Sequence, residues 1–161
     1  MDDYRKLKET LRVRPYLIAD LDGNVRLATE AEAFRALNEC GAFPTILVTN
    51  IGRSLERLSR LEPDRKKTYT LRQVAKTAGW QYPLAYKFCR MGLIAPSVQP
   101  FGGYGHAGLF SWTDLFVIGA IGLLWRNRIP LAGLAKVRSV LLGEEENRAA
   151  PPLEPMEQPL I

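Results

Sequence analysis

The sequence has little of what metal sites, disulfide frameworks and membrane spans require. Its 161 residues include two cysteines and one histidine. Cys40 and Cys89 lie far apart with no Cys-x-x-Cys or Cys/His pairing, which indicates neither a zinc site nor disulfides. The longest uninterrupted apolar run, from Leu115 to Trp125, has eleven residues, whereas a membrane span needs about 20. We therefore expect a buried helix there, no metal, no cofactor and no membrane association.

Acidic residues are scarce in one half of the chain. Between Lys67 and Gly143, nine Lys and Arg side chains stand against a single acid, Asp114, so this segment has a net charge of +8. Residues 1–66 carry twelve bases and eleven acids, and residues 144–161 carry one base and five acids. Each Lys or Arg that meets a phosphate releases condensed counterions, so this concentration of positive charge favours a polyanion as partner.

The change of charge near residue 66 coincides with a polar, proline-broken stretch, and together they predict a domain boundary. The N-terminus, MDDYRKLKET, has no apolar segment typical of a secretory signal. We expect an α+β protein with a small N-terminal α/β domain over residues 1–62, a linker over 63–67, a basic domain over 68–143 and a disordered, acidic, proline-rich tail over 144–161.

The N-terminal segment predicts two strands, two helices and a third strand. The expected strands are 16–19 and 25–28 around an Asp-Gly turn, followed by a helix over 29–40, a buried strand over 45–48 and a helix over 54–61. Thr29 and Glu32 have the spacing of a capping box, and Gly41 can end the first of these helices. Its apolar stripe, expected to face inward, is Ala33, Phe34, Leu37 and Cys40.

The same segment contains a pattern similar to the first two motifs of haloacid dehalogenase phosphatases. It consists of Asp20-Leu21-Asp22-Gly23 followed later by Ile46 to Asn50. In that chemistry one aspartate attacks phosphorus and a second acts as acid and base. Such enzymes also need a downstream lysine and an acidic pair for magnesium on a Rossmann-like sheet, and few residues remain before the basic segment. We therefore interpret Asp20 to Gly23 as a hairpin turn and expect no enzymatic activity and no catalytic residues.

The basic segment opens with two predicted helices joined by a tight turn. Thr70 can cap the first helix and Gly79 can end it. A second helix is expected to start near Gln81 or Tyr82, where Pro83 is tolerated because first-turn amides have no intrahelical partner. The residues of the first helix expected to face inward are Leu71, Val74, Ala75 and Ala78.

The second helix has two distinct faces in sequence. Its inward face is expected to carry Leu84, Phe88 and Met91, and its other face carries Pro83, Tyr86, Lys87 and Arg90. A helix in a DNA major groove must present donors for phosphates and base edges, and a ring for thymine methyls or sugars. A glycine-rich loop over 96–108 follows, and Ser111 with Asp114 forms a predicted capping box for a third helix.

These elements, taken in order over residues 69–142, resemble the DNA-binding domain of the MerR family. The resemblance rests on Tyr69-Thr70-Leu71, Ala75, Gly79, Gly92-Leu93-Ile94, the stretch from Phe110 to Leu115 and the stretch from Arg128 to Leu134. It implies a winged helix-turn-helix whose second helix enters the major groove and whose wing spans Tyr104 to Gly108. From the resemblance and from the polar, basic face of the second helix, we expect these DNA-binding residues: Thr70, Arg72, Lys76, Gln81, Tyr82, Pro83, Tyr86, Lys87, Arg90, Tyr104 and His106.

The resemblance implies a sequence-specific regulator of transcription that binds double-stranded DNA and is cytoplasmic and nucleoid-associated. Family activators dimerise through a long C-terminal helix, whereas this chain turns acidic and proline-rich after Leu142. We therefore expect a homodimer or a side-by-side oligomer on DNA, formed through residues 1–66 or between neighbouring modules. Two alternatives stay open: a winged-helix marker of DNA sites for packaging, recombination or partition, and an adaptor that docks a protein such as RNA polymerase.

Overall fold

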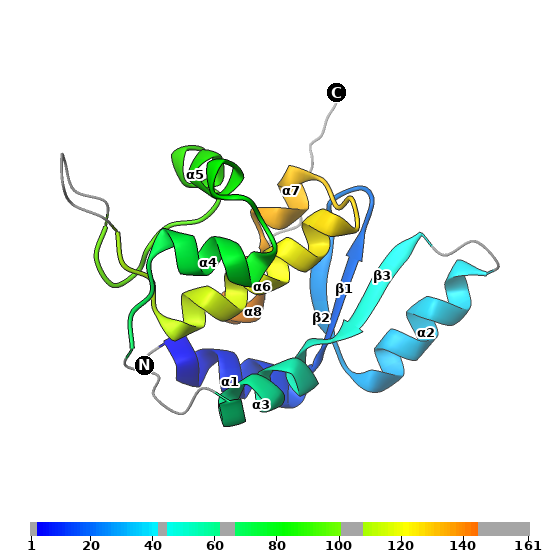
Figure 1. Cartoon of the computed structure of the whole chain (residues 1–161). Coiled ribbons are helices and arrows are strands. Elements are labelled where there is room, and N and C mark those ends of the chain that lie inside the picture. The colour runs from blue at the N-terminus through cyan, green and yellow to red at the C-terminus, as the bar shows by residue number, and fades with distance from the viewer. Residues whose placement is uncertain (1–2, 42–44, 62–66, 101–107, 145–161) are drawn as a thin grey trace.

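A computed structural model describes residues 3–41, 45–61, 67–100 and 108–144 of the chain (Figure 1). The fold is mixed α+β, as predicted, with helices on both sides of a small antiparallel sheet. Its elements are α1 (Asp3–Val13), β1 (Tyr16–Asp20), β2 (Val25–Ala28), α2 (Glu30–Cys40), β3 (Ile46–Asn50), α3 (Ile51–Leu61), α4 (Leu71–Ala78), α5 (Tyr82–Arg90), α6 (Trp112–Arg126), α7 (Leu131–Leu134) and α8 (Val137–Leu141).

The sheet has the strand order β2-β1-β3 and is antiparallel throughout. The predicted hairpin of β1 and β2 is confirmed. The Asp20 side chain accepts hydrogen bonds from the backbone N–H groups of Asp22 and Asn24, at 2.9 and 3.0 Å, and Gly23 has a φ of +90°. The bond from the Asn24 backbone is the main cause that lowers the pKa of Asp20. Asp20 therefore closes the turn, as expected.

The predicted helix over 29–40 is confirmed as α2, and the capping box at its start is formed. Its expected inward stripe is partly wrong. Ala33 is fully buried, but Phe34 and Leu37 are 53% and 41% exposed. The Phe34 ring meets Tyr16 of β1 with centroids 6.4 Å apart, but the three-stranded sheet leaves much of both side chains exposed.

The strand expected over 45–48 is present as β3, but the expectation that it is buried is wrong. Within the described residues it pairs with β1 alone, and all five of its residues are half-buried. α3 begins at Ile51, three residues before the predicted start, because the side chain of Asn50 accepts a 2.9 Å hydrogen bond from the Arg53 backbone N–H. The strand thus passes directly into a capped helix.

One apolar core joins the two segments that the sequence separates at 63–67. Its N-terminal members come from α1, the sheet and α3, and they pack with members from α4 to α8. Tyr4 of α1, for example, meets Trp112 of α6 edge to face with ring centroids 5.5 Å apart. A segment of about 60 residues buries too little surface to be very stable alone. The two predicted domains therefore share a core, while residues 62–66 at the predicted linker lie outside the described residues.

α6 runs through the centre of this core. The predicted capping box of Ser111 and Asp114 is present, and ten of its fifteen residues are buried, which confirms the buried helix expected from the apolar run. Within the described ranges, no helix is long and apolar enough to cross a membrane. Of the tail predicted over 144–161, residues 145–161 lie outside the described residues.

Helices α4 and α5 form where the sequence predicts them. Thr70 caps α4, Gly79 ends it with a φ of +77°, and the four residues expected to face inward are all buried. Gln81 is the N-cap residue of α5, and Pro83 lies in its first turn. Met91, expected on the inward face, is instead 49% exposed because it lies at the C-cap, where the chain leaves the helix.

Candidate nucleic-acid interface

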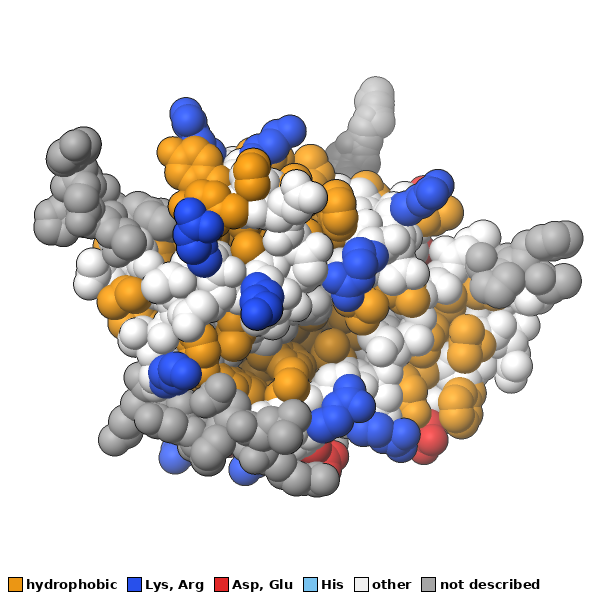
Figure 2. All heavy atoms as spheres, viewed as in Figure 1, with side chains coloured by type: hydrophobic (Ala, Val, Ile, Leu, Met, Phe, Trp, Pro, Cys, Tyr) orange, Lys and Arg blue, Asp and Glu red, His pale blue; other side chains and the backbone are white. Residues whose placement is uncertain are grey.

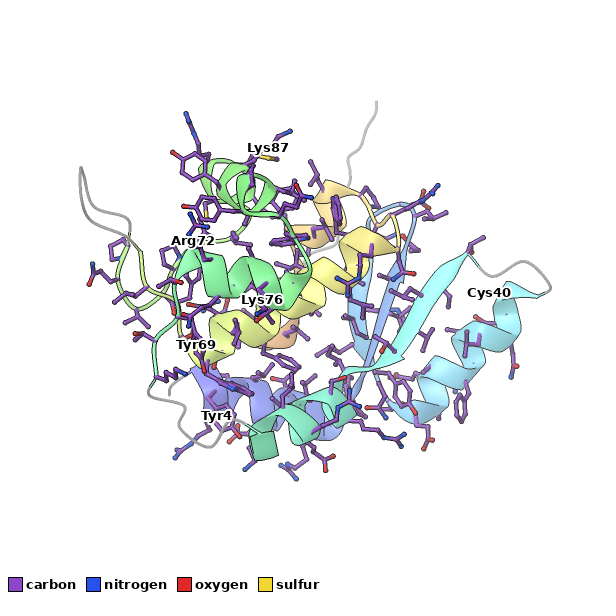
Figure 3. The ribbon with its side chains drawn as sticks, viewed as in Figure 1. Tyr4, Cys40, Tyr69, Arg72, Lys76 and Lys87 are labelled. Atoms are coloured by element: carbon purple, nitrogen blue, oxygen red, sulfur yellow. The ribbon has the colours of Figure 1, made fainter. Side chains whose placement is uncertain are left out.

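The outward side of α5 and the adjoining part of α4 gather most of the predicted DNA-binding residues on one surface. We call this surface the basic face. All of its members are exposed; they are Arg72, Lys76, Gln81, Tyr82, Pro83, Tyr86, Lys87 and Arg90. Figure 3 shows Arg72 between α4 and α5, with Lys76 on α4 and Lys87 on α5. The space-filling view shows Lys and Arg side chains spread over both helices (Figure 2).

Two arginines of the basic face lie over two tyrosines. The guanidinium of Arg72 is 4.5 Å from the ring centroid of Tyr82, and that of Arg90 is 5.9 Å from the ring centroid of Tyr86. Stacking of this kind orients the planar guanidinium while its N–H donors stay open to solvent. Because a guanidinium can bind two phosphate oxygens at once, the stacked pairs are suited to a phosphate backbone.

Several cations of the basic segment are instead tied into the fold. Arg126 donates a 2.7 Å hydrogen bond to the backbone carbonyl of Ala78, and Lys136 donates one of 3.3 Å to that of Gly23. Arg138 forms ion pairs with carboxylates of α6 and α1. The charge count from sequence did not separate these cations from those of the basic face, because all nine are alike in sequence.

The helices that carry the basic face, α4 and α5, contain no acidic residue. Asp114, the single acid between residues 67 and 143, is 1% exposed. Its carboxylate accepts hydrogen bonds from Ser97 and from the backbone of Ser111, at 2.6 to 3.0 Å. It is therefore a structural group inside the fold, and its charge is paired with Arg138.

Of the three remaining predicted DNA-binding residues, one lies apart from the basic face and two lie outside the described residues. Thr70 is exposed at the start of α4, where its hydroxyl accepts a 3.4 Å hydrogen bond from the Gln73 backbone N–H. Tyr104 and His106, assigned to the predicted wing, lie outside the described residues. The segments on either side of them pair, since Gln99 and Leu109 exchange backbone hydrogen bonds of 3.2 and 2.8 Å.

The position of α4 relative to α6 is set by a close approach. A Cβ atom on Gly122 would lie 2.5 Å from the carbonyl oxygen of Ala78, so the two helices cross as closely as a glycine allows. The hydrogen bond from Arg126 to Ala78 closes the same end of α4. Beyond the turn, Trp80 meets Phe88 of α5 edge to face at 4.9 Å. The basic face is therefore carried on helices that are anchored to the core.

The phosphatase-like pattern does not assemble a catalytic site in this fold. β1 and β3 are antiparallel, with Asp20 opposite Ile46 and Asn50 opposite Tyr16. The carboxyl ends of β1 and β3, where the two motifs lie, are therefore at opposite ends of the paired strands. The phosphatase chemistry requires the two motifs to lie together. Within the described residues, no cluster of His, Cys, Asp and Glu could hold a metal ion.

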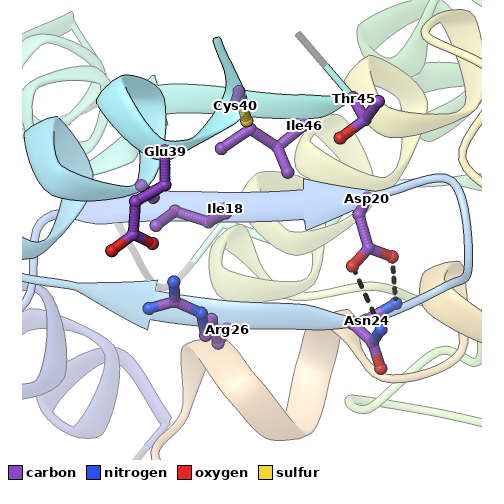
Figure 4. Close-up of a pocket in the computed structure, with 9 residues that line it drawn as sticks. Ile18, Asp20, Asn24, Arg26, Glu39, Cys40, Thr45 and Ile46 are labelled. Atoms are coloured by element: carbon purple, nitrogen blue, oxygen red, sulfur yellow. Dashed lines mark hydrogen bonds between the residues drawn. The ribbon is translucent and has the colours of Figure 1, made fainter.

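A hollow of about 350 Å³ lies between α2 and the sheet (Figure 4). Its charged groups are Asp20, Arg26 and Glu39. Asp20 is engaged by the Asn24 side chain at 3.0 Å, and Glu39 points across the hollow toward Arg26. Because Asp20 is committed to the turn and no nucleophile with an adjacent base lines the hollow, this arrangement does not indicate catalysis.

The surroundings of Cys89 do not favour a reactive thiol. Both cysteines are free thiols, and burial raises the pKa of Cys89, on α5, to about 11. A thiol with so high a pKa carries little of the nucleophilic thiolate at neutral pH. Cys89 is therefore best understood as a packing residue on the inner side of α5.

Comparisons with known proteins add no relative: no family model, curated protein or solved structure matches this chain. The functional interpretation rests on the basic face and on the sequence pattern that predicted it.

Proposed function

We propose that this protein binds double-stranded DNA through the basic face, with α5 in the major groove. The observation that carries the proposal is the acid-free surface on α4 and α5, where Arg72 and Arg90 stack on Tyr82 and Tyr86 beside Lys76 and Lys87. Positive charge, planar donors and exposed rings occur together there. That combination suits a ligand that offers both phosphates and base edges.

The dimensions of α5 support a groove-binding role. An α-helix with its side chains is about 10 to 12 Å across, and the major groove of B-DNA is about 12 Å wide. α5 is exposed along the side that bears Gln81, Tyr82, Tyr86 and Lys87, and its opposite side is anchored through Phe88. In this arrangement Arg72 and Lys76 of α4 meet the phosphates that border the groove.

The finer proposal is a winged helix-turn-helix of MerR-like type that regulates transcription at specific DNA sequences. It is supported by the sequence resemblance over residues 69–142, by the two helices joined at Gly79 and by the isolated β-bridge between Gln99 and Leu109. The packing of α4 against α6 at Gly122 gives such a unit a firm base. Recognition of a defined DNA sequence would then come from side chains of α5 such as Tyr86.

The proposal is tested by titrating a fluorescent 30-base-pair duplex with the full-length protein. The triple variant Lys76→Gln, Lys87→Gln and Arg90→Gln removes three cations of the basic face. Because each phosphate contact adds to affinity, we expect binding to weaken at least about 30-fold in moderate salt. The matched control Arg35→Gln removes an exposed cation from α2, on the far side of the sheet, and should bind like the wild type.

Equal affinity of the triple variant and the wild type would contradict the proposal. It would favour the adaptor interpretation, in which the protein docks another protein such as RNA polymerase. Selection of preferred duplexes from a random library separates the remaining possibilities. An enriched motif found at promoters supports a regulator, whereas one found at packaging, recombination or partition sites supports a site marker.

A further inference from the structure

α1 and α3 lie side by side along the lower edge of the molecule (Figure 1), and a cleft of about 520 Å³ lies between them. We call it the α1–α3 cleft. Its apolar lining comes from Leu11, Pro15 and Leu55. Its cations, all exposed, are Lys8, Arg12 and Arg53. Glu56 is the one acid among the described lining residues. An apolar floor with a mainly cationic rim suits a peptide that carries both apolar and acidic side chains.

The start of α3 is fixed against the end of α1. The Gly52 backbone N–H donates a 2.9 Å hydrogen bond to the carbonyl of Pro15, and the Asn50 side chain caps α3. A Cβ atom on Gly52 would lie 2.7 Å from the Cβ atom of Pro15, so the chain approaches Pro15 as closely as a glycine allows. The backbone on both sides of the cleft is therefore held in one arrangement.

The chemistry of residues 151–161 matches this cleft. Their sequence is PPLEPMEQPLI, which contains four prolines, two glutamates and no base. A proline-rich segment favours the polyproline II conformation, which has three residues per turn. In that conformation Leu153 and Met156 share one side, and Glu154 and Glu157 share the next. An apolar side therefore adjoins an acidic side, as the apolar lining and the cations adjoin in the cleft.

We propose that residues 151–161 bind in the α1–α3 cleft of the same molecule. Leu153 and Met156 lie against the apolar lining, and Glu154 and Glu157 face the cations of the rim. A segment too rich in proline and polar residues to fold alone can still bind a preformed surface. Polyproline II also costs little order on binding, because the conformation is largely set before the contact forms.

The described part of the chain brings this segment to α1. Glu144 forms a 3.7 Å ion pair with Lys6, and a Cβ atom on Gly143 would lie 2.9 Å from the hydroxyl oxygen of Thr10. Leu153 follows Glu144 by nine positions, which span up to about 30 Å when extended. A helix of the eleven residues of α1 is about 16 Å long and about 10 to 12 Å across. The segment can therefore pass round α1 and reach the cleft.

The basic face is the other surface whose charge would attract this segment. Figure 1 shows α5, which carries most of that face, on the opposite side of the molecule from α1. A tethered segment meets a site near its tether at an effective concentration in the millimolar range, which falls as the span increases. The nearer cleft is therefore favoured. This inference does not rest on DNA binding by the basic face, and its test contains no DNA.

Carbodiimide cross-linking of the full-length protein tests the contact, because the reagent joins an amine to a carboxylate only where the two groups meet. The linked peptides are identified by mass spectrometry after digestion. We expect Lys8 to link to Glu154 or Glu157. The ion pair of Lys6 with Glu144 supplies an internal standard for the yield.

Two results of this experiment would overturn the proposal. The first is a set of links from Lys76 or Lys87 to the two glutamates in place of links from Lys8, which would put the segment on the basic face. The second comes from an equal mixture of normal protein and protein labelled with heavy nitrogen. Lys8 links that join a light chain to a heavy chain would show that the segment binds a second copy instead of its own cleft.

Two double variants test the apolar part of the contact. Leu153→Ser with Met156→Ser keeps every charge and removes the apolar side of the segment, so the Lys8 link should fall at least about five-fold relative to the standard. Ala149→Ser with Ala150→Ser is the matched control just outside the segment and should keep the wild-type yield. A Lys8 link that is equally strong in both variants would refute docking on the apolar lining.

A third variant tests the cleft itself. Arg12→Gln with Arg53→Gln removes two exposed cations of the rim and leaves Lys8 free to react, so the Lys8 link should again fall at least about five-fold. Arg35→Gln, on α2, is the control and should leave the yield unchanged. An undiminished Lys8 link in the double variant would show that the rim does not hold the segment.

Discussion

Arg138 and Asp114 form an ion pair of 2.7 Å in which the carboxylate is 1% exposed. The second guanidinium nitrogen of Arg138 reaches Asp3 of α1 at 2.6 Å. Asp114 also completes the capping box of α6 with Ser111. It accepts hydrogen bonds from Ser97, which precedes the predicted wing in the sequence. One buried carboxylate thus connects the first helix, the central helix and the region that precedes the wing. The pair holds the fold together and contributes no charge to the basic face.

Asp114→Asn should destabilise the protein by about 3 kcal/mol, because removal of one partner leaves the Arg138 guanidinium without its buried counter-charge. Chemical denaturation followed by circular dichroism measures the loss. Lys6→Gln is the control, since the ion pair of Lys6 with Glu144 is 3.7 Å long and exposed, and exposed pairs contribute about 0 to 1 kcal/mol. Equal loss in the two variants would contradict the structural role of Asp114.

Leu7→Ala should lower the stability of the whole chain by about 2 to 5 kcal/mol in a single transition. Leu7 of α1 is fully buried in the core that also contains α4 and α6, and a large-to-small change there leaves a cavity. Amide hydrogen exchange of α1 and of α6 should accelerate together in the variant. Faster exchange in α1 with unchanged protection in α6 would show that the two halves unfold independently.

The elements predicted best from sequence were those with strong local signals. The capping boxes at Thr29 and Ser111, the N-cap at Thr70 and the helix end at Gly79 depend on residues close together in the chain, and all were confirmed. The buried face of α4 followed from helical spacing, and the burial of α6 followed from its uninterrupted apolar run. Local chemistry was sufficient in each of these cases.

Features that depend on distant parts of the chain were predicted poorly. The exposure of Phe34 and Leu37 reflects how narrow the sheet is, which no local pattern of α2 reveals. The shared core depends on packing between residues such as Leu7 and α6, far apart in sequence. Likewise Arg126 and Arg138 are indistinguishable in sequence from Lys87, and the contacts with Ala78 and Asp114 separate them.

Tyr86→Ala and Lys87→Ala should affect DNA binding in different ways. Tyr86, 48% exposed on the outward side of α5, is expected to meet a base edge or methyl group, so its loss should reduce discrimination between preferred and scrambled duplexes by about 1 to 3 kcal/mol. Lys87 is expected to meet a phosphate, so its loss should weaken both duplexes alike. Competition titrations with the two duplexes measure both effects. If Tyr86→Ala kept the full discrimination, Tyr86 would not be a base-reading residue.

The salt dependence of binding tests the central claim most directly. The affinity of the full-length protein for duplex DNA is measured between 50 and 300 mM salt, with the triple variant of Lys76, Lys87 and Arg90 alongside. If the four cations of the basic face meet phosphates, the log-log slope for each bound module should be about −3 to −4. The triple variant should reduce it by about 2 to 3. An affinity that does not change with salt, or the same slope in the variant and the wild type, would show that the basic face is not a DNA-binding surface.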